Sequence, residues 1–200
     1  MWIYVVCAIV AAAVLSPAFV IGIENTQLRE NSERLSVPKN SGTDVAVISF
    51  SRSGNTALMA QKIAQMFNAK EIRLKAPAYE AGFVGWTKSL KDARNQDAEV
   101  EPKEMDLTPF KTVYLGSPIW LYSPAPPIWA FLKANRFDGK HVVLFNSYNS
   151  KFEQRYIDEF KKISLERGAA SFEHKAINRG RMGFQLSTNE FLVEVEELFD

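Results

Sequence analysis

The sequence predicts an α/β fold in which a parallel sheet is covered by helices on both faces. Short apolar runs alternate with segments whose apolar residues recur at helical spacing. Strands that are apolar throughout are typical of a sheet buried on both sides, and their alternation with helices is typical of parallel strands joined by helical crossovers. Length is the third observation, because residues 44–200 have room for five such strands and the helices between them.

Each expected element rests on its own run of residues. The strands are recognised by short apolar runs, and the helices by apolar residues three or four positions apart. In chain order we expect strand 45–50, a helix whose face includes Leu58 to Phe67, strand 71–74, helix 84–96, strand 112–116, helix 128–134, strand 141–145, helix 151–167, strand 172–177 and a last helix carrying Phe191 to Leu198.

The last two helices also carry end signals. Ser150 with Glu153, and Ser187 with Glu190, have the spacing of a capping box, in which the two side chains satisfy each other's backbone N–H groups. Gly168 suits the end of the first of these helices, because glycine readily adopts the left-handed conformation found there.

The N-terminal segment differs from the rest of the chain. Residues 1–23 contain no charged residue, so all 24 basic and 23 acidic residues lie in residues 24–200. The uncharged stretch from residue 2 would measure about 33 Å as a helix, close to the roughly 30 Å core of a bilayer. Ser16, Pro17 and Ala18 also suit a signal-peptide cleavage site. A transmembrane anchor and a signal peptide both stay open, and both predict a membrane-anchored or exported (periplasmic or extracytoplasmic) protein.

The remaining residues divide into a polar linker, expected at residues 24–43, and a domain at residues 44–200. A net charge of +1 gives no support for nucleic-acid binding. The only cysteine is Cys7, which excludes a disulfide or a cysteine-ligated metal in the domain. His141 and His174 lack metal-ligand spacing, so we expect no metal site.

In a doubly wound sheet, ligands bind beyond the carboxyl ends of the strands. The first strand is followed by Ser51-Arg52-Ser53-Gly54-Asn55-Thr56, which leads directly into a helix. Hydroxyl groups, a glycine and free helix N–H groups suit a phosphate dianion, whereas the motifs for ATP and dinucleotides are missing. The alternative is an ordinary strand-to-helix turn capped by Ser53 or Asn55.

Two further segments at this edge carry aromatic residues. The proline-rich residues 117–127 include Trp120, which could stack on a planar ligand or pack under its own loop. Residues 146–150 include Tyr148, which could cover a second face while neighbouring amides and hydroxyls bind ring edges. Together with the phosphate-binding candidate, these segments predict a site for a phosphorylated planar ring.

These motifs resemble those of the flavodoxin family. The segment 51–56 is similar to the family's FMN-phosphate signature, residues 116–120 to its first flavin-contacting loop, and the resemblance covers residues 44–199. It implies a flavodoxin-like sheet of five parallel strands in the order 2-1-3-4-5, with FMN as cofactor. The implied contacts are Ser51, Ser53, Gly54, Asn55 and Thr56 to phosphate with Arg52 neutralising its charge, Pro118, Ile119 and Trp120 along the isoalloxazine, and Ser147, Tyr148 and Asn149 at its other face and edge.

The resemblance implies a redox protein whose chemistry belongs to the flavin, so we name no catalytic side chain. It leaves two modes open, electron transfer to a partner protein and NAD(P)H- or quinone-type oxidoreduction, and therefore does not decide whether the chain is an enzyme. The near-neutral domain departs from the strongly acidic electron carriers of the family. The alternative is a flavin-free domain of the same fold that acts in binding or as a scaffold.

Overall fold

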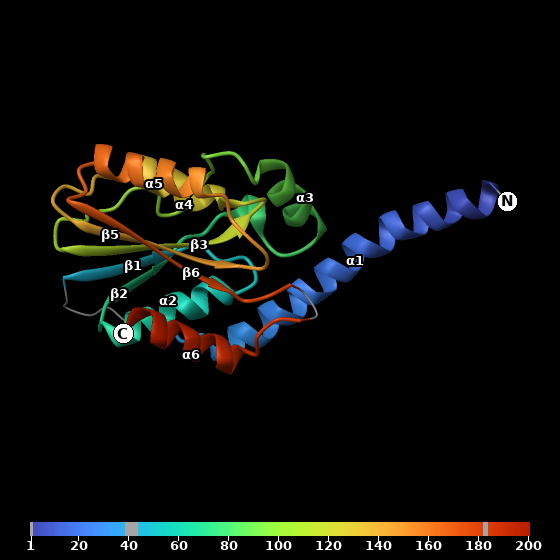
Figure 1. Cartoon of the computed structure of the whole chain (residues 1–200), viewed down its shortest axis with the longest axis horizontal. Coiled ribbons are helices and arrows are strands. Elements are labelled where there is room, and N and C mark those ends of the chain that lie inside the picture. Colours follow the sequence, from blue (N-terminus) through green and yellow to red (C-terminus); the bar gives the residue numbers. More distant parts are fainter. Residues whose placement is uncertain (1, 39–43, 182–183) are drawn as a thin grey trace.

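The structure is a computed structural model that describes residues 2–38, 44–181 and 184–200, and the side chains of these residues except those of 3–16. A parallel sheet lies at its centre, with helices on both faces (Figure 1). The elements are α1 (Trp2–Arg34), β1 (Val45–Ser49), α2 (Asn55–Met66), β2 (Lys70–Arg73), the 3-10 helix η1 (Pro77–Tyr79), α3 (Phe83–Asp92), β3 (Thr112–Trp120), β4 (Ser123–Pro124), α4 (Pro126–Ala134), β5 (His141–Tyr148), α5 (Gln154–Glu166), β6 (Ser171–Asn178) and α6 (Thr188–Phe199).

The strands follow the predicted order. The sheet reads β2-β1-β3-β5-β6, and each neighbouring pair along it is parallel. The two-residue β4 lies off this path and pairs antiparallel with the end of β3. The chain reverses its direction of winding between β1 and β3, so the carboxyl ends of these two strands border the crevice where doubly wound folds bind ligands. The predicted fold class is confirmed.

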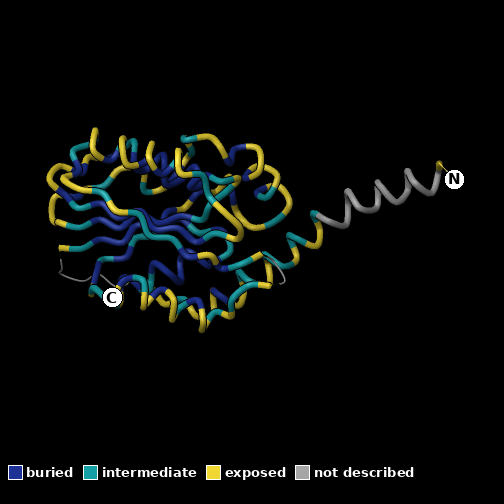
Figure 2. The backbone as a smooth tube through the Cα atoms, viewed as in Figure 1, coloured by how far each residue is buried: buried dark blue, intermediate teal, exposed yellow. Residues whose placement is uncertain are grey.

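Alternate strand residues build two separate cores, one on each face of the sheet. On one face Ile48 packs in a cluster with Trp129 of α4 and Phe160 of α5. On the other, Val47 packs in a cluster with Ile63 of α2 and residues of α6. Figure 2 shows the buried strands between the more exposed helical layers. Because both faces are covered, the edges of the sheet are where a ligand can reach the strands.

Two strands continue further than the apolar runs predicted. β3 and β5 stay paired as far as Pro118 and Ser147, because strand pairing depends on backbone groups rather than on apolar side chains. β3 then turns back into β4 through Leu121 and Tyr122, which both have positive φ, 41° and 78°. The segments predicted as loops after these strands are therefore partly regular, and residues 117–124 form a tight hairpin.

One of the two predicted capping boxes is wrong. α5 begins at Gln154 and its N-cap, Glu153, makes no side-chain cap. The backbone N–H of Glu153 donates instead to the carbonyl of Tyr122 at 3.0 Å. This bond to the β3–β4 hairpin replaces the predicted bond to Ser150, and the helix starts later than predicted. The box of Ser187 and Glu190 at the start of α6 is confirmed.

The largest difference lies in the expected linker. Residues 24–34 are the last third of α1 and pack beside α2 and α3 rather than forming a linker. Asn31 in this stretch is only 1% exposed. Its contacts with the domain are hydrogen bonds, which explains why a search for apolar periodicity misses this docked helix. Residues 39–43 of the expected linker lie outside the described residues.

The helix α1 extends beyond the domain toward its N-terminus (Figure 1). In the part of the chain whose side chains are described, no helix has a long enough apolar stretch to cross a membrane. The side chains of residues 1 and 3–16 are not described, so the role of residues 1–23 as a membrane-directed segment stays a prediction.

Candidate functional site

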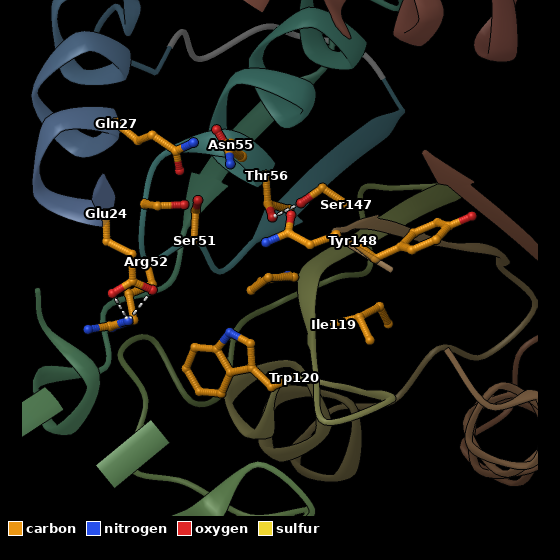
Figure 3. Close-up of a pocket in the computed structure, with 13 residues that line it drawn as sticks. Glu24, Gln27, Ser51, Arg52, Asn55, Thr56, Ile119, Trp120, Ser147 and Tyr148 are labelled. Carbon is orange, nitrogen blue, oxygen red and sulfur yellow. Dashed lines mark hydrogen bonds and ion pairs between the residues drawn. The ribbon is translucent and has the colours of Figure 1, made fainter. Parts of the chain in front are cut away.

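One pocket at the carboxyl edge of the sheet gathers the three segments singled out in the sequence (Figure 3). Eleven of the twelve predicted site residues line it, and the exception is Gly54. The helix α1 supplies two more lining residues that the sequence did not predict, Glu24 and Gln27. The lining is therefore Glu24, Gln27, Ser51, Arg52, Ser53, Asn55, Thr56, Pro118, Ile119, Trp120, Ser147, Tyr148 and Asn149.

The β1–α2 loop presents an uncapped helix N-terminus. Gly54 is the N-cap of α2 with φ of 87°, a conformation that glycine adopts without strain, and within the described part of the chain no side-chain hydrogen bond caps the helix at this residue. The Leu58 N–H donates to the Gly54 carbonyl, so the N–H groups ahead of it have no helical acceptor. Such free N–H groups, together with the helix dipole, attract an anion. Gly54 thus shapes the loop although it does not line the pocket.

A hydrogen bond joins this loop to the end of β5. The hydroxyls of Thr56 and Ser147 lie 2.8 Å apart and are buried. Behind them, the Asn146 side-chain amide donates to the Ser117 carbonyl at 2.8 Å and accepts from Nε2 of His174 at 3.0 Å. Burial lowers the pKa of His174 to about 4, so the ring is neutral near pH 7. These contacts fix the floor of the pocket, and His174 acts as a structural residue.

Arg52 forms a largely buried ion pair with Glu24 of α1. Its guanidinium donates to both carboxylate oxygens of Glu24, and the Arg52 and Glu24 side chains are 6% and 17% exposed. Burial raises the pKa of Glu24, although the charge of Arg52 acts in the opposite direction. Nε of Arg52 is buried and has no hydrogen-bond partner among the residues that the structure describes. The cation expected to face phosphate is thus already paired with a carboxylate at one side of the pocket.

Trp120 both packs against other aromatic residues and lines the pocket. Its ring packs edge-on against Phe50 at 5.6 Å and against Tyr79 at 5.3 Å between ring centroids, while the residue also lines the pocket. Tyr148 lines the pocket too, but its ring packs edge-on against Phe152 and points away from Trp120 (Figure 3). The aromatic wall of the pocket is therefore Trp120.

The helix α1 forms a wall that sequence reasoning missed. The side-chain amide of Asn31 donates to the Ser53 carbonyl and to Oδ1 of Asn55, both at 2.8 Å. Gln27 and Asn31 are four residues apart and Glu24 lies three residues before Gln27, so the three share one helix face. This polar periodicity was the available signal, and a search restricted to apolar periodicity cannot detect it.

The donor set suits a phosphorylated planar ring. Free helix N–H groups and the hydroxyls of Ser51 and Ser53 suit a dianion, and the partly exposed indole of Trp120 suits a flat ring beside it. The carboxylate of Glu24 has the wrong sign for a phosphate, but its charge is offset by Arg52. The residues present therefore fit such a group.

Fold and site together define a doubly wound α/β protein with an uncapped helix N-terminus at its switch point. A model of the family named Flavodoxin matches residues 44–179, and the chain belongs to this family. No curated protein matches the chain.

Solved structures share the fold at low sequence identity. A candidate flavoprotein from Bacteroides uniformis is 20% identical, with a TM-score of 0.60 over 78% of this chain and 99% of that one. A flavoprotein from Lactobacillus acidophilus, solved in complex with FMN, is also 20% identical, with a TM-score of 0.53 over 66% of this chain and 93% of that one. At this identity the likeness is one of fold.

Proposed function

We propose that the chain binds FMN in the pocket formed by the β1–α2 loop, the β3–β4 hairpin, the end of β5 and α1, and acts as a redox protein. The observation that carries the proposal is the convergence of three separate segments, each singled out for a phosphorylated ring, on one pocket at the switch point. Family membership and a fold relative solved with FMN support the choice of cofactor.

Different residues of the pocket would bind the phosphate and the ring of FMN. The uncapped N-terminus of α2 and the hydroxyls of Ser51 and Ser53 would bind the phosphate, and Trp120 would bind the ring. Thr56 and Ser147, joined by their hydrogen bond, would hold the two loops at a fixed separation. Bound FMN supplies transfer of one or two electrons, which no side chain of this pocket can supply alone.

The redox partner is a protein, a quinone or NAD(P)H, and the two modes inferred from the sequence stay open. We further propose that the uncharged residues 1–23 direct the chain to a membrane, as an anchor or as a cleaved signal. Mass spectrometry of the native protein separates these two: a mature start near Phe19 identifies a cleaved signal, and an intact Met1 identifies an anchor.

The test of the proposed function is spectroscopic. The purified full chain should show the visible absorption of an oxidised flavin, or should gain it when FMN is added and excess cofactor is removed. Riboflavin, which lacks the phosphate, is the matched control and should bind more weakly, because it leaves the N-terminus of α2 without its anion. A chain that takes up no FMN would instead be the flavin-free binding or scaffold domain.

A further inference from the structure

An apolar groove lies between α1 and α3, beside the candidate cofactor pocket. It is lined by Pro17, Ala18, Ile21, Gly22 and Asn25 of α1 and by Phe83 and Trp86 of α3. We call these residues, together with Val84, the α1–α3 groove.

The groove exposes apolar side chains that a soluble domain would normally bury. Phe83 is 62% exposed and Val84 is 79% exposed, at the start of a helix whose buried positions are Gly85, Ser89 and Asp92. The rings of Phe83 and Trp86 lie 6.5 Å apart between centroids. Contiguous exposed apolar surface of this kind marks an interaction site.

The course of α1 indicates what covers the groove. The helix α1 lines the groove between Pro17 and Asn25, and its residues 2–23 carry no charge. From Trp2 to Phe19 a helix rises about 26 Å, close to the roughly 30 Å thickness of a bilayer core. Trp2 is 83% exposed and Phe19 is 68% exposed, so large aromatic residues stand at both ends of that stretch. Aromatic residues at both ends are typical of a helix with its ends at the two membrane surfaces.

This placement puts α3 at the depth of the lipid headgroups. If residues 2–19 enter a bilayer, the groove residues of α1 that follow Phe19 lie at its surface, and α3 packs beside them. The exposed side of α3 carries Lys88 and Lys91 after Phe83 and Val84. Apolar residues next to lysines are the chemistry of a helix lying in a membrane interface.

We propose that the α1–α3 groove docks on a lipid bilayer, with Phe83 and Val84 inserted at the boundary between headgroups and acyl chains. The inference rests on the proposed attachment of the chain to a membrane through residues 1–23. Docking would also orient the cofactor pocket, because Gly82, which precedes α3, accepts a hydrogen bond from Arg52 at 3.3 Å. The pocket then opens close to the membrane surface, and a redox partner dissolved in or bound to that membrane reaches it directly.

The experiment places an environment-sensitive fluorophore on single cysteines of the full chain. Cys7 is the only natural cysteine, so wild type reports on the N-terminal segment, and the Cys7→Ser background accepts Val84→Cys or Val193→Cys. Val193 is the matched control, because it is a valine 52% exposed on α6. Each labelled chain is placed in vesicles of phosphatidylcholine, with and without phosphatidylglycerol, that contain lipids brominated near the headgroup.

Docking predicts that the label at position 84 shifts its emission to shorter wavelength and loses intensity to the brominated lipids, while the label at position 193 does neither. Equal behaviour at positions 84 and 193 overturns the docking proposal. If the label on Cys7 is then quenched, attachment through residues 1–23 stands and docking alone fails. If the label on Cys7 also stays in water, both proposals fail, and the FMN test is unaffected.

Discussion

The two walls of the candidate pocket arise in different ways. The first wall consists of residues 51–56, the β3–β4 hairpin and the end of β5, all of which follow strands of the sheet. The second wall is α1, which comes from upstream of β1, lines the pocket with Glu24 and Gln27, and holds the β1–α2 loop through Asn31. Sheet topology places the first wall, because its segments follow strands that end at the same edge, whereas polar side-chain contacts place the second. The candidate pocket therefore combines a part placed by the sheet with a part placed by the N-terminal helix.

The largest expected effect comes where the two walls touch. A Cβ atom at Gly54 would lie 2.6 Å from Cβ of Asn31, and φ at this position is 87°. Gly54→Ala should therefore weaken FMN binding by about 3 kcal/mol, through backbone strain of about 1–2 kcal/mol and a clash with α1. Fluorescence titration with FMN measures the loss.

A second variant separates these two causes. Asn31→Gly removes the clashing atom together with the two hydrogen bonds of Asn31, so it should cost less FMN affinity in the Gly54→Ala background than in the wild type. If Asn31→Gly costs the same FMN affinity in both backgrounds, α1 does not press on the loop, and the comparison between the two walls fails at this point.

Trp120 tests the first wall alone. Trp120→Ala should weaken FMN binding by about 1–3 kcal/mol, the range for an aromatic side chain stacked on a flat ring. It should also lower the free energy of unfolding, because the indole packs against Phe50 and Tyr79. Trp120→Phe, which keeps an aromatic face, should retain much of both. Reduced stability with unchanged FMN affinity would mean that Trp120 only packs.

Asn31 tests the second wall alone. Asn31→Ala removes one buried and one partly buried hydrogen bond and should weaken FMN binding by about 1 kcal/mol, because the Ser53 carbonyl and the Asn55 side chain are then no longer bonded to α1. Calorimetric titration compares it with Ser32→Ala, the exposed neighbour on the same helix, which should bind FMN like wild type. Equal affinities for the two variants would remove α1 from the site.

The smallest expected effect is that of Glu24→Gln, which should lower stability but tighten FMN binding. Glu24→Gln leaves Arg52 without its buried partner and should destabilise the free protein, yet it removes a negative charge beside the phosphate loop and should tighten FMN binding by up to about 1 kcal/mol. Burial raises the pKa of Glu24, so acidification should neutralise it and shrink the difference in affinity from wild type. Glu33→Gln, an exposed change on the same helix, is the control. Weaker FMN binding by Glu24→Gln would assign Glu24 a supporting role in the site.

The sequence predicts the first wall of the pocket but not the second. Residues 51–56 predict an anion-binding turn from local sequence alone, because glycine, serine and asparagine stand between a strand and a helix. The capping box of Ser150 and Glu153 was predicted wrongly, because the carbonyl of Tyr122, distant in sequence, takes the Glu153 N–H. The α1 wall was missed for a related reason: its residues are polar, and only the folded chain brings Asn31 to Ser53.

Hydrogen–deuterium exchange of the full chain with and without FMN tests the central claim most directly, because it reports on both walls in one measurement. The proposed site predicts that FMN slows exchange both in residues 51–58 of the β1–α2 loop and in residues 24–34 of α1. Protection of the loop without any change in α1 would contradict the two-walled pocket, and no protection in either segment would contradict FMN binding at this site.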